Sequence, residues 1–354
     1  MTLEKKVTIR QVASTAGVSI QTVSRVVNNH PYVADETRQR VQEVISQLKY
    51  RPDAIARSLI KGRSYTLGVV VAELEHNGPH RLLAGIEKQA TALGYSLSLS
   101  IVRYTEPENA MLQLERLFSH QLDGVIWAVP EINNHHWVQT YLRSTNIPIV
   151  FVTGGVVPGL PTVLSDNRSG GCLATEHLLA HGYRQIGLIS GPRTWTAARE
   201  RQRGWQEALA AANQSTDNRR VMEGDWSAAS GEHGLYHLIE QFPEIDAVFA
   251  CNDYMAVEAL QAAHLLGRRV PEDLAVVGFD ATPEAAYFWP PLTSVRQHLL
   301  GAGSAAVGEL SRVIELTRNG ENDAQPTCVV IQPELIVRKS SVPTKLAHAA
   351  MHGV

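Results

Sequence analysis

The stretch "VTIRQVASTAGVSIQTVSRVVNN", residues 7–29, contains two short helical patterns separated by a glycine. Thr8 is a suitable N-cap for the first helix, and Gly17 supplies the turn that ends it. Ser19 is a suitable N-cap for a second helix over residues 20–28. We therefore predict two consecutive short helices joined by a tight turn.

The packing of these helices is indicated by Ala13, Gly17 and Val23. A small residue lets two helices approach, glycine permits the turn, and a branched side chain packs between them, as a helix-turn-helix requires. A third helix is predicted to begin at Asp35. Its buried stripe has the i, i+3, i+4, i+7 spacing and consists of Val41, Val44, Ile45 and Leu48.

The second helix would bury Val23, Val26 and Val27 and direct short polar side chains outward. Ser, Thr, Gln and Arg side chains reach phosphates and base edges, and the second helix of such a motif lies in the DNA major groove. The DNA contacts predicted for the three-helix N-terminal region are Thr8, Ile20, Gln21, Thr22, Ser24, Arg25, Asn28 and Tyr32. The alternative is a three-helix bundle whose polar face meets only water.

The charge of the chain is unevenly distributed. Residues 1–64 carry eleven Lys and Arg against five Asp and Glu, a net charge of +6. The whole chain has a net charge of −3, which leaves −9 for the remainder. A basic segment with helical periodicity on an acidic body favours contact with a polyanion over a solvated tail.

Residues 7–29, together with "YRPDAIARSLIKGRS" at 50–64, resemble the DNA-binding head and hinge of the lac repressor (LacI/GalR) family. The resemblance implies a hinge that becomes helical only on operator DNA, where two hinges pair in the minor groove and a leucine opens a base step. Leu59 matches that leucine, and Arg57 is placed to contact phosphates. So short a helix is unstable alone because nucleation is costly. The alternative is a plain linker.

From residue 65 onward, apolar runs alternate with amphipathic helices, which is typical of doubly wound parallel sheets. The predicted strands are 66–72, 96–102, 124–129, 148–152, 185–190, 247–251 and 274–279, and the predicted helices are 79–93, 107–120, 169–181, 198–213, 228–241, 254–266 and 299–318. The final segment "CVVIQPELIVRK" is strand-like and is expected to complete both lobes. The resemblance implies the two-lobed fold of type I periplasmic binding proteins.

The predicted fold is α/β: an N-terminal three-helix helix-turn-helix head and a hinge helix, followed by two doubly wound parallel-sheet lobes. The expected parts are a DNA-binding domain at 1–49, a hinge at 50–64, an effector-binding and dimerisation domain at 65–341, and a flexible tail at 342–354. Lobe one is expected to comprise 65–165 and 298–326, and lobe two 166–297 and 327–341.

A ligand site is predicted beyond the carboxyl ends of the strands, where open α/β sheets bind ligands. The side chains expected there combine a cation, a carboxylate, amides and an indole, which suit the hydroxyls and the C–H face of a sugar. The candidates are Asn77, Pro79, Thr153, Arg201, Trp226, Asn252, Asp280 and Gln297.

The resemblance implies that Arg201, Asn252 and Asp280 hold sugar hydroxyls and that Trp226 packs on the ligand. The family's namesake has Asp in place of Thr153, so one hydroxyl contact differs, and a galactoside is one candidate among small sugars. The expected function is a sequence-specific repressor whose operator binding is controlled by such a sugar. The alternative is a corepressor-type regulator that senses a purine or a phosphorylated sugar, with Arg193 and His80 as extra partners.

Other functional classes have little support in the sequence. The G-x-S-x-G, H-E-x-x-H and G-x-x-x-x-G-K-[ST] motifs are absent, so we do not expect an enzyme. Cys172, Cys251 and Cys328 are far apart and match no metal spacing, so neither a metal nor a cofactor is expected.

The expected location and assembly follow from similar arguments. The three widely spaced cysteines are interpreted as buried thiols of a reducing compartment, which favours the cytoplasm. The chain has no apolar run of about 18 residues and no apolar N-terminal region, so neither a membrane segment nor a secretory signal is expected. Two heads and two hinges imply a homodimer on near-palindromic operator DNA. The tail after Ser341 has no leucine heptads, so a tetramerising coiled coil is not expected.

Overall fold

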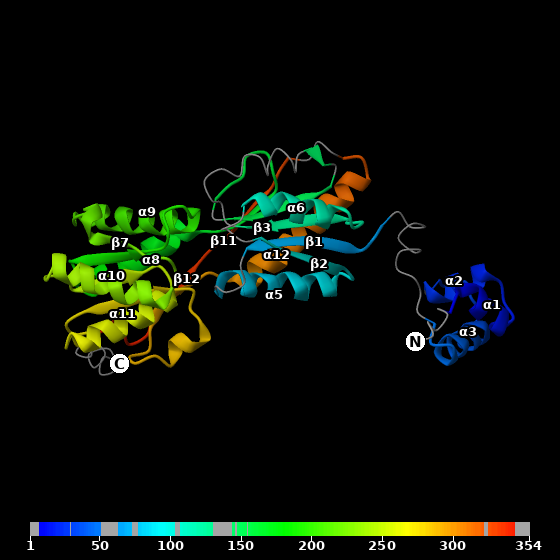
Figure 1. Cartoon of the computed structure of the whole chain (residues 1–354), viewed down its shortest axis with the longest axis horizontal. Coiled ribbons are helices and arrows are strands. Elements are labelled where there is room, and N and C mark those ends of the chain that lie inside the picture. Colours follow the sequence, from blue (N-terminus) through cyan, green and yellow to red (C-terminus); the bar gives the residue numbers. More distant parts are fainter. Residues whose placement is uncertain are drawn as a thin grey trace, which may run out of the picture. The chain divides into compact units, whose positions relative to one another are not determined.

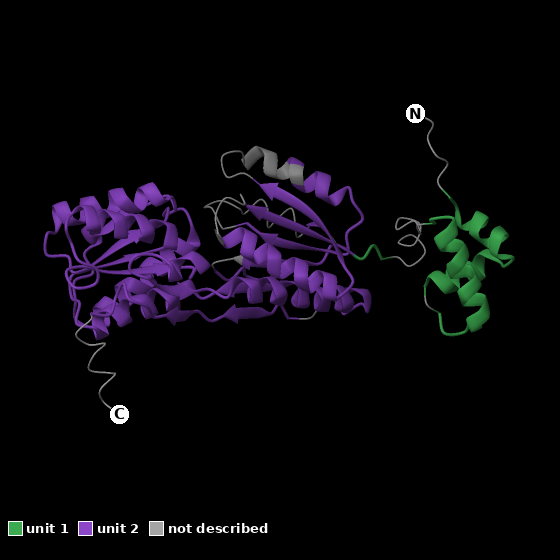
Figure 2. Cartoon of the chain, turned by 90° about the horizontal axis from the view of Figure 1, so that it is seen from below, with its two compact units in different colours: residues 1–65 green, residues 66–354 purple. Residues whose placement is uncertain are grey.

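The computed structural model describes residues 7–28, 30–50, 63–72, 77–102, 107–129, 144–145, 147–153, 155–321 and 325–343. The chain folds into two compact units, residues 1–65 and 66–354 (Figure 2). Most of the predicted hinge and nearly all of the predicted tail lie outside the described residues.

The first unit is the three-helix head. It consists of α1 (Ile9–Ala16), α2 (Ile20–Val27) and α3 (Asp35–Gln47). The Thr8 and Ser19 hydroxyls accept hydrogen bonds from backbone N–H groups of the first turns, and Gly17 has a φ of +63°. The buried side chains that hold the helices together are Val12, Ala13, Ala16, Val23, Val26, Val41 and Val44. The predicted helix-turn-helix is confirmed, with α2 ending one residue earlier, at Val27.

The second unit contains two lobes, each built around a six-stranded sheet (Figure 1). The sheet orders are β11-β5-β4-β3-β1-β2 in lobe one and β12-β10-β9-β8-β6-β7 in lobe two. Lobe one contains β1 (Thr66–Ala72), α5 (Asn77–Ala92), β2 (Ser96–Val102), α6 (Pro107–Phe118), β3 (Gly124–Ala128), β4 (Ile149–Thr153), β5 (Thr162–Ser165), α12 (Leu299–Arg318) and β11 (Cys328–Ile331). Lobe two contains α8 (Asn167–Ala180), β6 (Ile186–Ser190), α9 (Thr196–Ala211), β7 (Val221–Glu223), α10 (Ala228–Gln241), β8 (Ala247–Ala250), α11 (Asp253–Leu265), β9 (Ala275–Phe279), β10 (Thr293–Arg296) and β12 (Glu334–Ile336).

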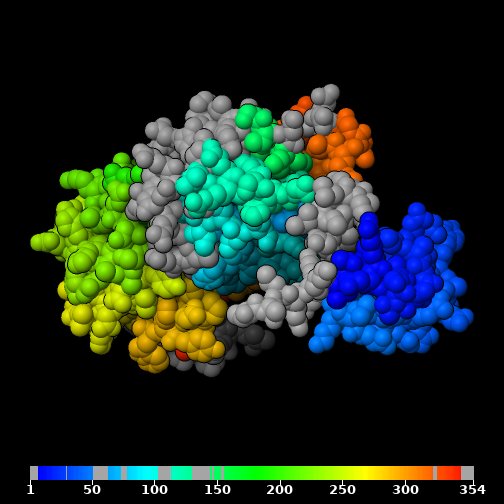
Figure 3. Space-filling model, turned by 45° about the vertical axis from the view of Figure 1, so that its right-hand side comes forward, coloured from blue at the N-terminus to red at the C-terminus, as the bar shows by residue number. Residues whose placement is uncertain are grey.

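Helices cover both faces of each sheet, as the doubly wound prediction requires. In lobe one, α5 and α12 pack on one face and α6 on the other. In lobe two, α8 pairs with α9 and α10 pairs with α11. The space-filling view shows the surfaces of lobe one (cyan and teal) and lobe two (green to gold) side by side (Figure 3). The seven predicted strands and seven predicted helices of this unit are present, with ends shifted by at most two residues.

Short strands were missed by the sequence analysis. Strands β5, β7 and β10 have only three or four residues, too few to produce a readable apolar pattern. Their place in the sheets depends on neighbours that are distant in sequence.

The C-terminal segment corrects one expected boundary. Lobe two was expected to include residues 327–341, but β11 pairs with β5 in the first sheet. Only β12 joins lobe two, where it runs antiparallel to β10. The chain passes between the lobes at Gln332 and Pro333, because proline cannot donate a ladder hydrogen bond and so ends the pairing.

Close packing of α8 against α9 in lobe two fixes the backbone position of Arg201, a predicted ligand residue. A Cβ on Gly171 of α8 would lie 2.3 Å from the Arg201 carbonyl oxygen of α9. A Cβ on Gly204 would lie 2.1 Å from the carbonyl oxygen of Arg168. The two backbones are therefore in direct contact, and this contact sets the position of Arg201.

No helix in the described ranges combines the length and apolarity that crossing a bilayer requires.

Candidate functional site

One face of α2 is a polar surface. Gln21 and Arg25 are exposed and Ile20 is 43% exposed, whereas Val23 and Val26 are buried in the head. A recognition helix needs this division, because one face fills the core while the other contacts base edges.

Three of the predicted DNA contacts also have roles within the head. Thr8 caps α1 through a reciprocal capping box. The Thr22 hydroxyl lies 2.9 Å from the Ser19 hydroxyl. The Asn28 side-chain amide donates to the Ser24 carbonyl at 2.7 Å, at the end of α2. The first of these bonds fixes the start of α1, and the other two fix the two ends of α2.

The remaining predicted DNA contacts fall into two groups. Tyr32 is 83% exposed in the segment between α2 and α3, and its ring centroid lies 5.5 Å from that of His30. Arg57 and Leu59 lie outside the described residues.

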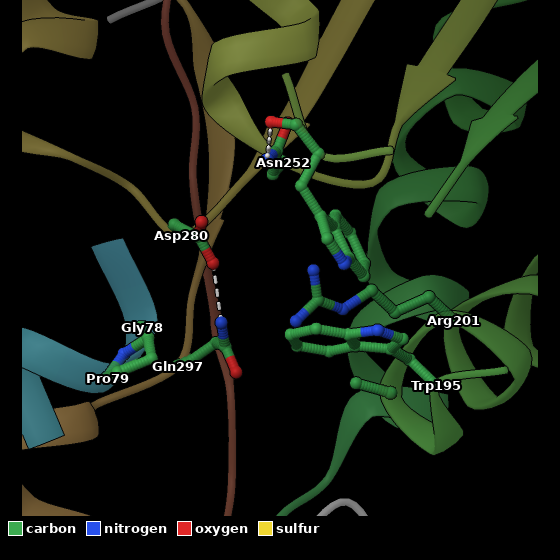
Figure 4. A pocket seen from close by; sticks show the side chains of 9 residues that line it. Gly78, Pro79, Trp195, Arg201, Asn252, Asp280 and Gln297 are labelled. Carbon is green, nitrogen blue, oxygen red and sulfur yellow. Dashed lines mark hydrogen bonds between the residues drawn. The ribbon is translucent and has the colours of Figure 1, made fainter. Parts of the chain in front are cut away.

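A pocket lies beyond the carboxyl ends of the second sheet's strands (Figure 4). Its described lining consists of Gly78, Pro79, Trp195, Ala197, Arg201, Trp226, Asn252, Asp280 and Gln297. Gly78 and Pro79 come from the first turn of α5 in lobe one, and the others come from lobe two or its connection to α12. Six of the eight predicted ligand residues are thus brought together.

The other two predicted ligand residues are not part of this lining. Asn77 is the first residue of α5 and Thr153 the last residue of β4, and the side chains of both lie outside the described set. Sequence reasoning missed Trp195 and Ala197, whereas Gly78 belongs to the Asn77–Pro79 segment that was expected to line the site. The signal for Trp195 was available, because it closes the "SGPRTW" segment directly after a buried strand.

Arg201 is the cation of the pocket, and most of its guanidinium is already engaged. It is 5% exposed, its Nε donates to Asn167 Oδ1 at 2.8 Å, and its Nη1 donates to the Cys251 carbonyl. Its guanidinium carbon lies 3.7 Å from the centroid of the Phe279 ring. Burial lowers the pKa of Arg201, while the negative charge of Asp280 acts in the opposite direction.

These bonds limit how many donors Arg201 has for the sugar hydroxyls that it is expected to hold. Two of its three nitrogens donate within the protein because the side chain links α8, α9 and the end of β8. Nη2 makes no hydrogen bond with any described residue and is the nitrogen left for a ligand.

Opposite Arg201, Asp280 and Gln297 form a hydrogen-bonded pair. Gln297 Nε2 donates to Asp280 Oδ1 at 2.5 Å (Figure 4). Asp280 has a φ of +108° and Ala281 has a φ of +48°. Two consecutive non-glycine residues in the left-handed region cost free energy, and such strain concentrates at functional sites. The pair presents carboxylate and amide oxygens to the pocket.

The aromatic surface of the pocket differs from the prediction. Trp226 was expected to offer a flat face to the ligand, but it is only 7% exposed. The ring of Trp195 meets it edge-on, with centroids 5.6 Å apart and planes inclined at 66°. Trp195 is half-buried and supplies the more accessible indole (Figure 4).

Asn252 holds the site together. It was expected to hold a sugar hydroxyl, but its Oδ1 accepts from the Met255 N–H at 2.8 Å as the N-cap of α11. Its Nδ2 donates to the Trp226 carbonyl at 2.9 Å (Figure 4). The amide therefore positions the Trp226 loop while lining the pocket.

Beside it, Asp253 belongs to a buried network behind the pocket. It accepts hydrogen bonds from the Thr282 N–H at 2.7 Å and the Ser294 hydroxyl at 2.5 Å. Burial, together with the charge of Asp280, raises the pKa of Asp253 to about 7.

The two extra partners expected for a charged ligand do not line the pocket. Arg193 Nε lies 3.2 Å from Glu223 Oε2, and its backbone N–H donates to the same carboxylate. His80 is exposed on α5. Arg201 is thus the one cation among the described lining residues.

Comparison with known proteins agrees with this architecture. Residues 8–53 match the model of the lacI family of bacterial regulatory proteins, and residues 175–341 match that of the periplasmic binding protein-like domain. The HTH-type transcriptional repressor PurR of Mannheimia succiniciproducens is 35% identical over 335 residues, which cover 94% of this chain and 98% of the relative.

The chain belongs to the lacI family. Among solved structures of this family, the lac repressor dimer bound to operator and the anti-inducer ONPF is 30% identical, with a TM-score of 0.86. That similarity covers 96% of this chain and all of the other. A complex of the transcriptional regulator CelR with cellobiose is 31% identical, with a TM-score of 0.70, over 95% of this chain and all of the other.

In the lacI family, the N-terminal unit binds DNA and the larger unit binds an effector. Effector binding also agrees with the chemistry of the pocket, which holds polar groups suited to binding. Across the described ranges, no three His, Cys, Asp or Glu side chains are placed together to hold a metal ion.

Proposed function

We propose that this chain is a cytoplasmic, homodimeric repressor whose operator binding is controlled by a small sugar in the pocket. The observation that carries this proposal is the pocket itself: Arg201 faces the Asp280–Gln297 pair within a chain that also has a helix-turn-helix head. We assign DNA binding to residues 1–49, the hinge to 50–64, and effector binding and dimerisation to 65–341.

The electrostatics of the pocket support a neutral ligand. Among the described lining residues, Arg201 is the one cation and Asp280 the one carboxylate, and their charges oppose each other. A phosphorylated sugar would need further cations to balance its charge. Arg193 is paired with Glu223 and is not among the lining residues, so it supplies no such charge. Sugar hydroxyls, by contrast, donate to carboxylate and amide oxygens and accept from an arginine.

A purine is the second candidate, and the presence of Trp195 beside Trp226 favours it over a phosphorylated sugar. Flat bases stack on aromatic side chains. However, these two rings meet edge-on at 66°, with centroids 5.6 Å apart, so they leave no parallel slot for a base between them. A single indole face suits the C–H face of a pyranose equally well. The cellobiose held by the related CelR adds support for a sugar.

For DNA, we propose that Ile20 and Gln21 read base edges from the start of α2 and that Arg25 follows one turn later. We assign Thr8, Thr22, Ser24, Asn28 and Tyr32 to further operator contacts. In the hinge, Arg57 would contact a phosphate and Leu59 would open a base step in the minor groove.

For the dimer, exposed apolar side chains of lobe two support an interface. Tyr287 and Trp289 are 88% and 94% exposed, and Leu265 is 62% exposed. Trp289 also lines a surface groove together with Val270 and Phe288. Large exposed aromatic side chains of this kind mark protein interfaces. The related lac repressor is a dimer on its operator.

The test is a thermal-shift screen of the full chain, followed by operator binding. The panel contains methyl β-D-galactopyranoside, cellobiose, hypoxanthine and glucose 6-phosphate. We expect a neutral sugar to raise the melting temperature and to change the salt-dependent retardation of operator DNA. Stabilisation by hypoxanthine alone would establish the purine alternative in its place.

A further inference from the structure

The indole N–H of Trp226 is a buried donor in the pocket wall. Trp226 lines the pocket, is 7% exposed, and its Nε1 has no acceptor in the described part of the chain. Folded proteins rarely leave such a group unsatisfied, and the exceptions call for an explanation. Trp205 Nε1 shares this property, but Trp205 lies in the core of lobe two and does not line the pocket.

The backbone holds this indole in one place. Trp226 has a φ of +72°, a conformation that costs free energy in a non-glycine residue. The Asn252 side chain donates to its carbonyl at 2.9 Å. Its ring packs so closely on Gly191 that a Cβ there would lie 2.1 Å from two ring atoms. The N–H is therefore preorganised rather than free to turn toward another acceptor.

A second donor lies nearby. The Arg201 guanidinium carbon is 5.4 Å from the centroid of the Trp226 ring, and Nη2 of Arg201 makes no hydrogen bond with described residues. Both residues line the same pocket, so the two donors are neighbours in its wall.

We propose that Trp226 N–H and Arg201 Nη2 together bind one acceptor oxygen of the effector. Trp226 is then a specificity-determining hydrogen-bond donor rather than an aromatic platform. The inference rests on the proposed function, because it takes the pocket to be the effector site. It requires an uncharged ether, hydroxyl or carbonyl oxygen at this point, since Asp280 already balances the charge of Arg201. A ligand that presents an N–H here would leave both donors without an acceptor.

The experiment compares Trp226→Phe, which removes the N–H and keeps an aromatic ring, with Trp195→Phe, which makes the same change in the neighbouring indole. The probes for calorimetric titration of the full chain are cellobiose, methyl β-D-galactopyranoside and the monodeoxy analogues of the galactoside. We expect Trp226→Phe to weaken binding of a parent sugar by about 10-fold or more. We also expect one deoxy analogue to bind wild type and Trp226→Phe equally, because it lacks the oxygen that the indole holds.

The indole ¹⁵N–¹H spectrum provides an independent readout. The Trp226 signal, identified by its loss in Trp226→Phe, should move to a hydrogen-bonded position when the sugar binds. Equal loss of affinity for every deoxy analogue, or a Trp226 signal that does not move on binding, would overturn the inference and leave the pocket's function intact. If no sugar binds wild type, the proposed sugar function fails instead. In that case, the same comparison is made with hypoxanthine, and equal binding by wild type and Trp226→Phe would overturn the inference.

Discussion

Arg201→Ala should destabilise lobe two as well as abolish effector binding. The substitution removes the donors to Asn167 Oδ1 and the Cys251 carbonyl, both in a buried environment. It also removes the guanidinium that lies 3.7 Å from the Phe279 ring. A buried acceptor that loses its donor costs about 1–3 kcal/mol, and a desolvated cation–π contact is worth about 1–2 kcal/mol. Relief from burying a charge offsets part of this, as the lowered pKa of Arg201 indicates.

We therefore expect a net loss of about 2–5 kcal/mol in the free energy of unfolding of lobe two. Urea unfolding of the full chain measures it through tryptophan fluorescence, since all six tryptophans lie after residue 66 and none is in the head. With a urea dependence of about 3 kcal/mol/M, the midpoint should fall by roughly 1 M.

Arg203→Ala is the matched control on the same helix. The Arg203 side chain is 59% exposed and, among the described residues, pairs with Glu200 alone, so its removal should change stability by less than about 1 kcal/mol. An Arg201→Ala protein as stable as Arg203→Ala would refute a structural role for the guanidinium. An Arg201→Ala protein that still responds to the effector at wild-type concentrations would remove Arg201 from the binding site. Operator binding without effector should persist, because the residues proposed to contact DNA lie in a separate unit.

Three further predictions concern other parts of the chain. Exchanging Ile20 and Gln21 should re-rank operators at about 1–3 kcal/mol for each lost base contact, and an unchanged ranking over a randomised operator library would contradict their role. Trp289→Ala should weaken the dimer by about 2 kcal/mol, which is roughly a 30-fold increase in its dissociation constant. Sedimentation at micromolar concentration measures this, and a dimer as stable as wild type would show that the interface lies elsewhere. The pKa of Asp253 is raised to about 7 in the folded protein. The folded protein therefore keeps a proton on this carboxyl group that the unfolded chain releases above about pH 4. As a result, the contribution of Asp253 to the free energy of unfolding falls as the pH rises toward 7. Urea unfolding between pH 5 and 8 should show that fall in wild type relative to Asp253→Asn, and parallel profiles would show that Asp253 does not titrate there.

The head could be predicted from the sequence because its signals are local. Hydroxyl caps at Thr8 and Ser19, the turn at Gly17 and a valine stripe all act within a few residues of one another. The longer strands of the body were predicted for the same reason, since burial on both faces makes them continuous apolar runs. The strand-end rule also placed most of the pocket, because parallel strands bring their carboxyl ends to one edge.

The tertiary structure decided what each pocket residue does. Arg201 finds Asn167 34 residues away and Cys251 50 residues away, so its engagement within the protein could not be read from local sequence. Asn252 turns out to hold the Trp226 loop, across 26 residues. Likewise, β11 and β12 enter different sheets because their pairing partners, β5 and β10, are more than 35 residues earlier in the chain. Sequence patterns specify which face of an element is buried, but the partner of a buried polar group depends on how distant elements pack.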